Sequence, residues 1–434
     1  MEWNSALILI VVVIIILVMT GLPVAIALLT ASLILLWMIV GPFRTMYMMS
    51  QEIGHFWSSW TVLAIPLFVL MGELLFVAGS ASDIFDMVSK WLRRLRGGLA
   101  LVSTGACAVF ASMCGSTAGG TSTMALVTIP EMLKRGYNQR LATGSIAAAG
   151  ALAHLIPPSI LMVVYASIVE ISPGRALMAA LIPGILLAVY YGIIVTIWTT
   201  LKPGHAPQEP PSTWNEKFSS LKVAWQPIVL IMAVMGTLYF GVATATEAAA
   251  MGAFVALIMA LFKTRGNLRK IGHGFIDGAR ISCFIMLIAV SGKIIAMTMT
   301  YYMIPQHIVD IMLGLNLSPL MIMVMIQLLY IFLGMFIEPI GIMVVTLPIV
   351  APVLIALGFD PYWFGVMIMV NFEIALVTPP MGTQLYIIKG IVPQVPLGDI
   401  LKGSLVFLIA PTVMLVTLYR FPQLALWLPS MMWQ

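Results

Sequence analysis

Long apolar runs recur along the whole chain, and they constrain the fold more than any other feature. A helix needs about 20 predominantly apolar residues to cross the roughly 30 Å hydrocarbon core of a bilayer. Of the 434 residues, 61% are hydrophobic and only 9% are charged, whereas soluble domains carry about 25% charged residues. The sequence therefore predicts an all-α polytopic membrane protein. The clearest apolar runs are Ala6–Leu17, Val24–Val40, Ala176–Leu201, Ile228–Phe240 and Leu401–Leu418.

A polar segment, residues 202–222, divides the chain into two parts of similar length. It contains four prolines, and prolines clustered among polar residues are typical of a linker. We expect a first repeat at 1–201 and a second at 223–434, because glycine and proline landmarks recur with matched spacing in both. The matched spacings run from Gly21 to Gly72 and from Gly241 to Gly292, and from Gly136 to Pro157 and from Gly358 to Pro379.

Basic residues indicate how the two repeats lie in the membrane, because cytoplasmic loops carry an excess of Lys and Arg. Such residues surround Gly136, fill the linker and cluster at 263–280, whereas the turn at the matching Gly358 has none. Equivalent points are thus predicted on opposite sides, which makes the repeat inverted, as in secondary transporters. We expect a multi-pass protein of the bacterial inner membrane with a cytoplasmic linker at 202–222.

Two apolar segments are interrupted at their centres by polar or glycine-rich residues. The first, about 99–132, has its centre at 110–124, and the second, about 319–357, has its centre at 334–341. The flanks are too short to span a membrane alone, and both flanks of each segment end on the same predicted side. Each segment is therefore predicted to be a re-entrant hairpin. Irregular backbone at that depth persists only when it is buried in protein or lines a wet cavity.

Two further apolar segments, about 141–168 and about 361–389, each contain a Pro-Pro pair. Proline removes a backbone donor and clashes with the preceding turn, so each pair predicts a discontinuous helix. Freed carbonyl groups can then ligate a cation, and half-helix N-termini can face an anion. Hydroxyl groups at the four interruptions add neutral oxygen ligands for sodium, or else satisfy their own helix backbone. They belong to Ser116, Thr117, Thr121, Ser122, Ser159, Thr378 and Thr383.

Ionisable residues inside apolar runs are costly and usually functional. Glu338 lies in the centre of the second hairpin, and His154 lies three residues before the first Pro-Pro pair. Both are candidates for substrate contact or proton relay. For Glu73, Glu247 and Lys293 we expect structural pairing. The sequence has no GxxxxGK[ST] phosphate-binding loop and no clustered catalytic set, so we expect no enzyme and no cofactor, and an ion gradient must supply the energy.

The most distinctive stretches are 114–117, 128–132, 134–138, 141–144 and 156–160 in the first half, and 334–339, 356–361, 370–374 and 378–382 in the second. Together they resemble the large membrane subunit of the tripartite ATP-independent periplasmic (TRAP) transporter family, within the ion transporter superfamily. The resemblance covers essentially the whole chain. It departs at His154, where a small or aliphatic residue is usual, at Ala375, where glycine is common, and at Thr383-Gln384, where Leu-Asn is commoner.

The resemblance implies an elevator mechanism, in which the two hairpins and two broken helices form a mobile transport domain. It implies a small four-helix membrane subunit and a periplasmic binding protein as partners, and a small carboxylate as substrate. It also implies two sodium ions held mostly by backbone carbonyl groups. The implied first sodium site comprises Ser112, Gly115, Ser116, Ala153, Ile156 and Pro158, and the second comprises Gly334, Ala375, Thr378 and Met381.

We therefore expect a sodium-coupled permease that imports a small organic anion and depends on partner proteins. One alternative is a stand-alone dicarboxylate carrier or Na+/H+ exchanger of the same superfamily, which would need no binding protein. Another is a structural membrane protein without transport, which would need no polar residues at four paired breaks. The residues expected to bind substrate are Ser116, Thr117, Thr121, His154, Ser159, Glu338 and Thr383.

Overall fold

The computed structural model describes residues 2–92, 95, 97–114, 117–207, 213–315, 317–380 and 382–432, with backbone alone at 111–114, 223 and 224. Within these residues every regular element is a helix. The elements are α1 (Trp3–Met19), α2 (Val24–Val40), α3 (Pro42–Ser58), α4 (Ala64–Val77), α5 (Ser80–Leu92), α6 (Gly98–Cys114), α7 (Thr117–Lys134), α8 (Gln139–Ala151), η1 (Leu152–His154), α9 (Ile160–Val169), α10 (Pro173–Leu201), η2 (Pro203–His205), α11 (Trp214–Tyr239), α12 (Ala245–Lys263), α13 (Leu268–Tyr301), α14 (Ile304–Gly314), α15 (Pro319–Gly334), α16 (Pro339–Ala356), α17 (Pro361–Ala375), α18 (Thr383–Ile391), α19 (Leu397–Phe407), α20 (Ile409–Arg420) and α21 (Gln423–Met431).

Several of these helices have the length and composition of membrane spans. In the described part of the chain, five spans are long and apolar enough to cross a bilayer, or seven if each of two bent helix pairs counts as one. The bends are 69° between α4 and α5 and 60° within α11. The protein is therefore an all-helical, multi-pass membrane protein. The five are α10, α12, α13, α16 and the combined segment Leu397–Arg420.

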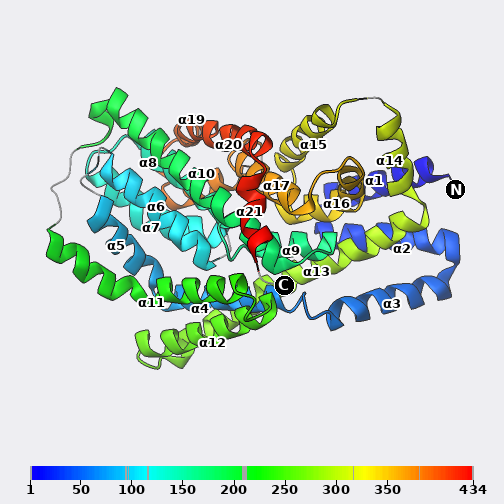
Figure 1. The fold of residues 1–434 in the computed structure, drawn as a ribbon, viewed down its shortest axis with the longest axis horizontal. Helices are drawn as coiled ribbons and strands as arrows, with labels where there is room; N and C mark the ends of the chain where they lie inside the picture. The colour runs from blue at the N-terminus through cyan, green and yellow to red at the C-terminus, as the bar shows by residue number, and fades with distance from the viewer. Residues whose placement is uncertain are drawn as a thin grey trace.

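The helices form an elongated bundle (Figure 1). Helices α5 to α8 gather toward one end, and α1, α2, α3 and α14 toward the other. The long helix α13 connects these regions by packing against α2, α4 and α16. Near the middle, α9 and α17 lie beside each other, and the hydroxyl of Tyr165 on α9 donates to the carbonyl of Pro361 at the start of α17, at 2.6 Å.

The two predicted hairpin segments each contain a pair of helices that contact one another. Helices α6 and α7 make up the first pair, and α15 and α16 the second. In the second pair the non-helical turn is 335–338, and Glu338 occupies the N-cap position of α16. Pro339 follows as the first helical residue, a position where proline is favoured because its missing N–H would have no partner.

The two Pro-Pro segments each contain a helix that stops and restarts. The first consists of α8, η1, a non-helical stretch at 155–159, and α9. The second consists of α17, a non-helical stretch described at 376–380 and 382, and α18. Asn138 and Asp360 cap the first helix of each by accepting backbone N–H bonds. The peptide bonds Pro157-Pro158 and Pro379-Pro380 are both cis.

Two glycines allow α8 and α19 to touch through their backbones. A Cβ atom on Gly144 would overlap the backbone of Gly403, and one on Gly403 would overlap the carbonyl of Arg140. The guanidinium of Arg140 also donates to Asp399 at 2.8 Å. This contact fixes the first broken helix against a helix of the second half, so segments far apart in the sequence converge around one centre.

Candidate functional site

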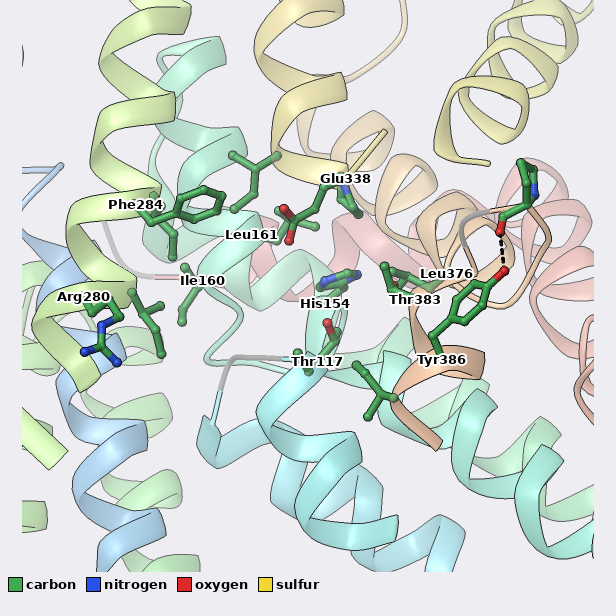
Figure 2. Close-up of a pocket in the computed structure, with 17 residues that line it drawn as sticks. Thr117, His154, Ile160, Leu161, Arg280, Phe284, Glu338, Leu376, Thr383 and Tyr386 are labelled. Carbon is green, nitrogen blue, oxygen red and sulfur yellow. Dashed lines mark hydrogen bonds between the residues drawn. The ribbon is translucent and has the colours of Figure 1, made fainter. Parts of the chain in front are cut away.

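A cavity of about 800 Å³ lies where the four interrupted segments meet. It is lined by Thr117 from the first hairpin, His154 from the first break, Glu338 from the second hairpin and Thr383 from the second break. Figure 2 shows these side chains around one space. The structure thus brings together one candidate substrate residue from each interruption.

Each of the four interrupted segments places the start of a helix at this cavity. Thr117, Ile160, Pro339 and Thr383 are the first residues of α7, α9, α16 and α18, and all four line the cavity. The first amide groups of an α-helix have no partner within the helix. Four helix N-termini therefore border one space, and each is equivalent to roughly half a positive charge.

Glu338 is the carboxylate at this cavity. Its side chain is exposed and makes no capping hydrogen bond to α16. The positive ends of the four N-termini favour a negative charge beside them, whereas the Glu338 carboxylate and the helix ends at His154 and Leu376, which also line the cavity, oppose it.

Several buried polar groups near the cavity have no hydrogen-bond partner among the residues that the structure describes. They are the Nδ1 atom of His154, the hydroxyl of Thr121, and both side-chain amide atoms of Gln384. These residues lie on η1, α7 and α18, and α7 contacts both other elements. Buried polar groups are ordinarily hydrogen-bonded, so such a group marks a place where water, an ion or a ligand can bind.

Two predicted substrate residues have other surroundings. Thr121 is fully buried one turn beyond Thr117 and packs against Gly150. The hydroxyl of Ser159 donates to the carbonyl of His154 at 2.5 Å and accepts from the amide of Met162 at 3.2 Å. Neither lines the cavity, and Ser159 holds the first break in shape. Ser116 lies outside the described residues.

The first predicted sodium set is partly described. Gly115, Ser116 and the side chain of Ser112 lie outside the described part. Ala153, Ile156 and Pro158 are buried within the first break. In the portion of the chain that the structure describes, no backbone amide donates to the carbonyls of Ile156 and Pro158. These oxygens have the free lone pairs that a cation site requires.

The second predicted sodium set brings the second hairpin and the second break into contact. A Cβ atom on Gly334 would overlap the methyl group of Ala375. The hydroxyl of Thr378 donates to the carbonyl of Ile374 at 2.6 Å, so its oxygen lone pairs stay available. Met381 lies outside the described residues. The ion binding of both sets stays a prediction.

Two polar cavity residues were absent from the sequence-based set. Arg280 on α13 lies at the edge of the cavity, and its guanidinium donates to Asp277 at 3.2 Å. Tyr386 is three residues beyond Thr383, and its hydroxyl donates to the carbonyl of Pro380 at 3.1 Å (Figure 2). Helical spacing places residues three apart on one face, so Thr383 could have pointed to Tyr386. No local sequence pattern pointed to Arg280, because it lies on α13, outside the four interrupted segments.

Three ionisable residues for which structural pairing was predicted do not line the cavity. Glu247 forms a capping box with Thr244 at the start of α12. Lys293 donates to Glu170 at 2.5 Å. Glu73 on α4 lies near another carboxylate, Asp277 of α13, and takes part in none of the ion pairs found among the described residues, so its predicted pairing is not observed there. A further carboxyl, that of Glu373 on α17, is fully buried and accepts from the hydroxyl of Tyr191 at 3.4 Å.

Residues 11–424 match the family described as the tripartite ATP-independent periplasmic transporter, DctM component. The chain is 31% identical to the C4-dicarboxylate TRAP transporter large permease protein DctM of Vibrio cholerae, over 95% of each chain. It is 30% identical to the sialic acid TRAP transporter large permease protein SiaM of the same organism, over 95% of each. It is 28% identical to the ectoine TRAP transporter large permease protein TeaC of Halomonas elongata, over 94% of this chain and 95% of that one.

Two solved structures share the fold at low sequence identity. The YdaH transporter of Alcanivorax borkumensis superposes with a TM-score of 0.61 at 13% identity, covering 90% of this chain and 91% of that one. MtrF of Neisseria gonorrhoeae superposes with a TM-score of 0.63 at 14% identity, covering 88% and 85%. These similarities establish the fold alone.

Proposed function

Because this chain belongs to the DctM family of TRAP transporters, whose members are permease subunits and not enzymes, we propose that it imports a small organic anion, a carboxylate, coupled to a sodium gradient. It does so as the large permease of the bacterial inner membrane, with the linker 202–222 in the cytoplasm. A small four-helix membrane subunit and a periplasmic binding protein complete the transporter. No cofactor takes part.

One observation carries the proposal: four helix N-termini border the same cavity. Unpaired amide groups and the positive ends of helix dipoles attract carboxylates. Thr117 and Thr383 add hydroxyl donors, and His154 adds a ring nitrogen without a protein partner. A carboxylate ligand would accept from these hydroxyls and from the His154 ring nitrogen.

The coupling ions would occupy the breaks on either side of this substrate cavity. The first uses the carbonyls of Ala153, Ile156 and Pro158 with the tip of the first hairpin. The second uses Gly334, Ala375 and Thr378 with the tip of the second. A cation in each break neutralises the carbonyl oxygens that the interrupted helices expose, and it raises the affinity for an anion between them.

Transport would proceed by an elevator movement of the hairpins and broken helices as one domain. The inverted arrangement of the two repeats allows one site to be exposed to either side. Arg280 belongs to the basic segment 263–280 that is predicted to face the cytoplasm, and it lies at the edge of the cavity. We infer that this conformation opens inward.

The test is uptake into proteoliposomes that contain the chain and the small membrane subunit. We expect uptake only with a substrate-loaded binding protein and an inward sodium gradient. Removing sodium, or replacing the binding protein with its unloaded form, should abolish it. Strong uptake without a binding protein would overturn the tripartite assignment in favour of a stand-alone carrier. Uptake that does not depend on sodium would overturn the proposed coupling to a sodium gradient.

A further inference from the structure

A second cavity of about 740 Å³ lies between α10 and α11, away from the site described above. All the side chains that line it are apolar except for Tyr239. On α10 these residues follow one helical stripe that includes Met178, Leu181 and Ile185. The cavity reaches Pro157 in the first break. It therefore lies beside a segment whose geometry determines the proposed sodium site.

This apolar cavity opens toward the surroundings of the helix bundle. Among its lining residues, Ile185 is 53% exposed, Val189 is 50% exposed and Met232 is 68% exposed. These residues lie on helices long or apolar enough to cross a bilayer, so the opening faces lipid. An apolar space that is open to a bilayer takes up hydrocarbon, because leaving its lining without partner atoms forfeits dispersion contacts.

A polar cavity of about 680 Å³ lies next to the apolar one. Both are lined by residues from α10, from α11 and from the C-terminal end of the chain. On α10, Arg175 of the polar cavity is followed one turn later by Met178 of the apolar cavity. At the C-terminal end of the chain, Met432 and Leu428 make the same transition. Trp60, which is 62% exposed, lines the polar cavity. Exposed tryptophans are enriched at the level of lipid headgroups.

Arg175 gives the polar cavity its positive charge. Within the described ranges, no carboxylate lies within ion-pair distance of its guanidinium. Two acidic residues on adjoining segments have other partners: Glu170 accepts from Lys293, and Glu247 accepts from the amide of Thr244. In the first turn of α10, Pro173 has no N–H and the amide of Arg175 donates to the hydroxyl of Ser172 at 3.5 Å. Within the described residues the amide of Gly174 remains as a donor beside Arg175, and such an amide favours phosphate.

We propose that these two cavities form one binding site for a phospholipid, with its phosphate at Arg175 and an acyl chain between α10 and α11. Charge complementarity selects the headgroup, because an unpaired guanidinium binds phosphate through parallel hydrogen bonds. The apolar stripe on α10 accommodates the acyl chain of the lipid. The inference does not depend on the substrate or the coupling ion.

The test compares two lipids on the purified full chain by native mass spectrometry. One is palmitoyl-oleoyl phosphatidylglycerol, and the other is palmitoyl-oleoyl glycerol, which has the same chains and no phosphate. We expect about tenfold greater retention of the phospholipid. Arg175→Gln should remove this preference, and Arg175→Lys should keep part of it. Ala188→Trp, which fills the apolar cavity, should lower the retention of both lipids.

Arg420→Gln is the matched control, because Arg420 is an exposed arginine that lines neither cavity. It should retain lipid like the unmodified chain. Equal retention of both lipids by the unmodified chain, or unchanged preference in Arg175→Gln, would overturn the proposal. Displacement of the phospholipid by the small membrane subunit would also overturn it, since the surface would then be a protein interface. Unchanged melting temperatures show that the variants are folded.

Discussion

The two Pro-Pro breaks interrupt matching helices but are held in shape by different means. In the first break, the hydroxyl of Ser159 bonds both the carbonyl of His154 and the amide of Met162. In the second, the backbone N–H of Gln384 donates to the carbonyl of Leu376 at 3.2 Å. The hydroxyl of Thr378 bonds only to the carbonyl of Ile374, within its own helical turn. The first break depends on one side chain, and the second is closed by the main chain.

The chemistry at the two breaks differs as well. The first half contributes His154 and Thr117 to the cavity, and the second contributes Glu338 and Thr383. Both halves contribute two helix N-termini. The backbone frame is therefore matched between the halves, whereas the side chains that face a ligand are not. In the proposed function, the shared frame attracts an anion and the unmatched side chains discriminate among anions.

The strongest test of the shared frame adds a negative charge to each half in turn. In Thr117→Asp and Thr383→Asp a carboxylate replaces a hydroxyl at a helix start that faces the cavity. Two like charges about 4 Å apart repel by about 4 kcal/mol at an effective dielectric constant of about 20, so sodium-driven uptake should fall at least about 100-fold. The melting temperature should not fall, because an acidic residue stabilises a helix N-terminus.

The neutral variants Thr117→Asn and Thr383→Asn are the controls and should retain most of the uptake. If Asp is tolerated in one half only, the anion binds at the other half and the matched frame is the wrong description. If Asp is tolerated in both, the helix starts do not bind the anion.

A second test compares packing at the two hairpins. Gly334→Ala places a methyl group against Ala375, and overpacking of this kind costs about 1–3 kcal/mol of stability. Gly120 in the first hairpin has open space around its would-be Cβ atom, so Gly120→Ala should stabilise α7 by about 0.5–1 kcal/mol. Thermal unfolding in detergent measures both.

In the double variant Gly334→Ala with Ala375→Gly, loss of the Ala375 methyl group makes room for the methyl group added at position 334. Its melting temperature should recover toward that of the unmodified chain. A Gly334→Ala protein as stable as the original, or a double variant no better than the single one, would show that the second hairpin and the second break do not touch.

A third test addresses how each break is closed. Ser159→Ala removes a helix cap and the bond to the His154 carbonyl, so the free energy of unfolding should fall by about 1–2 kcal/mol. Thr378→Ala removes one bond within a helical turn and should change it by less than about 0.5 kcal/mol. Equal losses in the two variants would remove the distinction between the breaks.

The smallest expected effect concerns Tyr386. Tyr386→Phe removes a partly solvated hydrogen bond to the carbonyl of Pro380, and such a bond contributes about 0.5–1.5 kcal/mol at most. We expect the KM for substrate to rise about twofold and the maximal rate to stay unchanged. A large fall in rate with unchanged KM would mean that Tyr386 acts on the movement of the second break and not on binding.

The interruptions were predictable from sequence because proline and glycine act locally. The Pro-Pro pairs and the polar centre around Glu338 fall where helices stop in the structure. Which hydroxyls face the cavity was not predictable, because Thr117 and Thr121 lie one turn apart and only the packing of α7 against α8 separates them. Arg280 was missed for a similar reason, since α13 reaches the cavity through tertiary packing alone.

A binding surface built from helix starts has an evolutionary consequence. Every residue except proline keeps its main-chain amide whatever its side chain, so few mutations would erase the proposed attraction of this cavity for negative charge. Mutation can readily change the few side chains that project between the four helix starts. Relatives about 30% identical to this chain carry names that refer to a C4-dicarboxylate, sialic acid and ectoine. A frame of this kind lets a lineage change its cargo through a few substitutions while the fold stays the same.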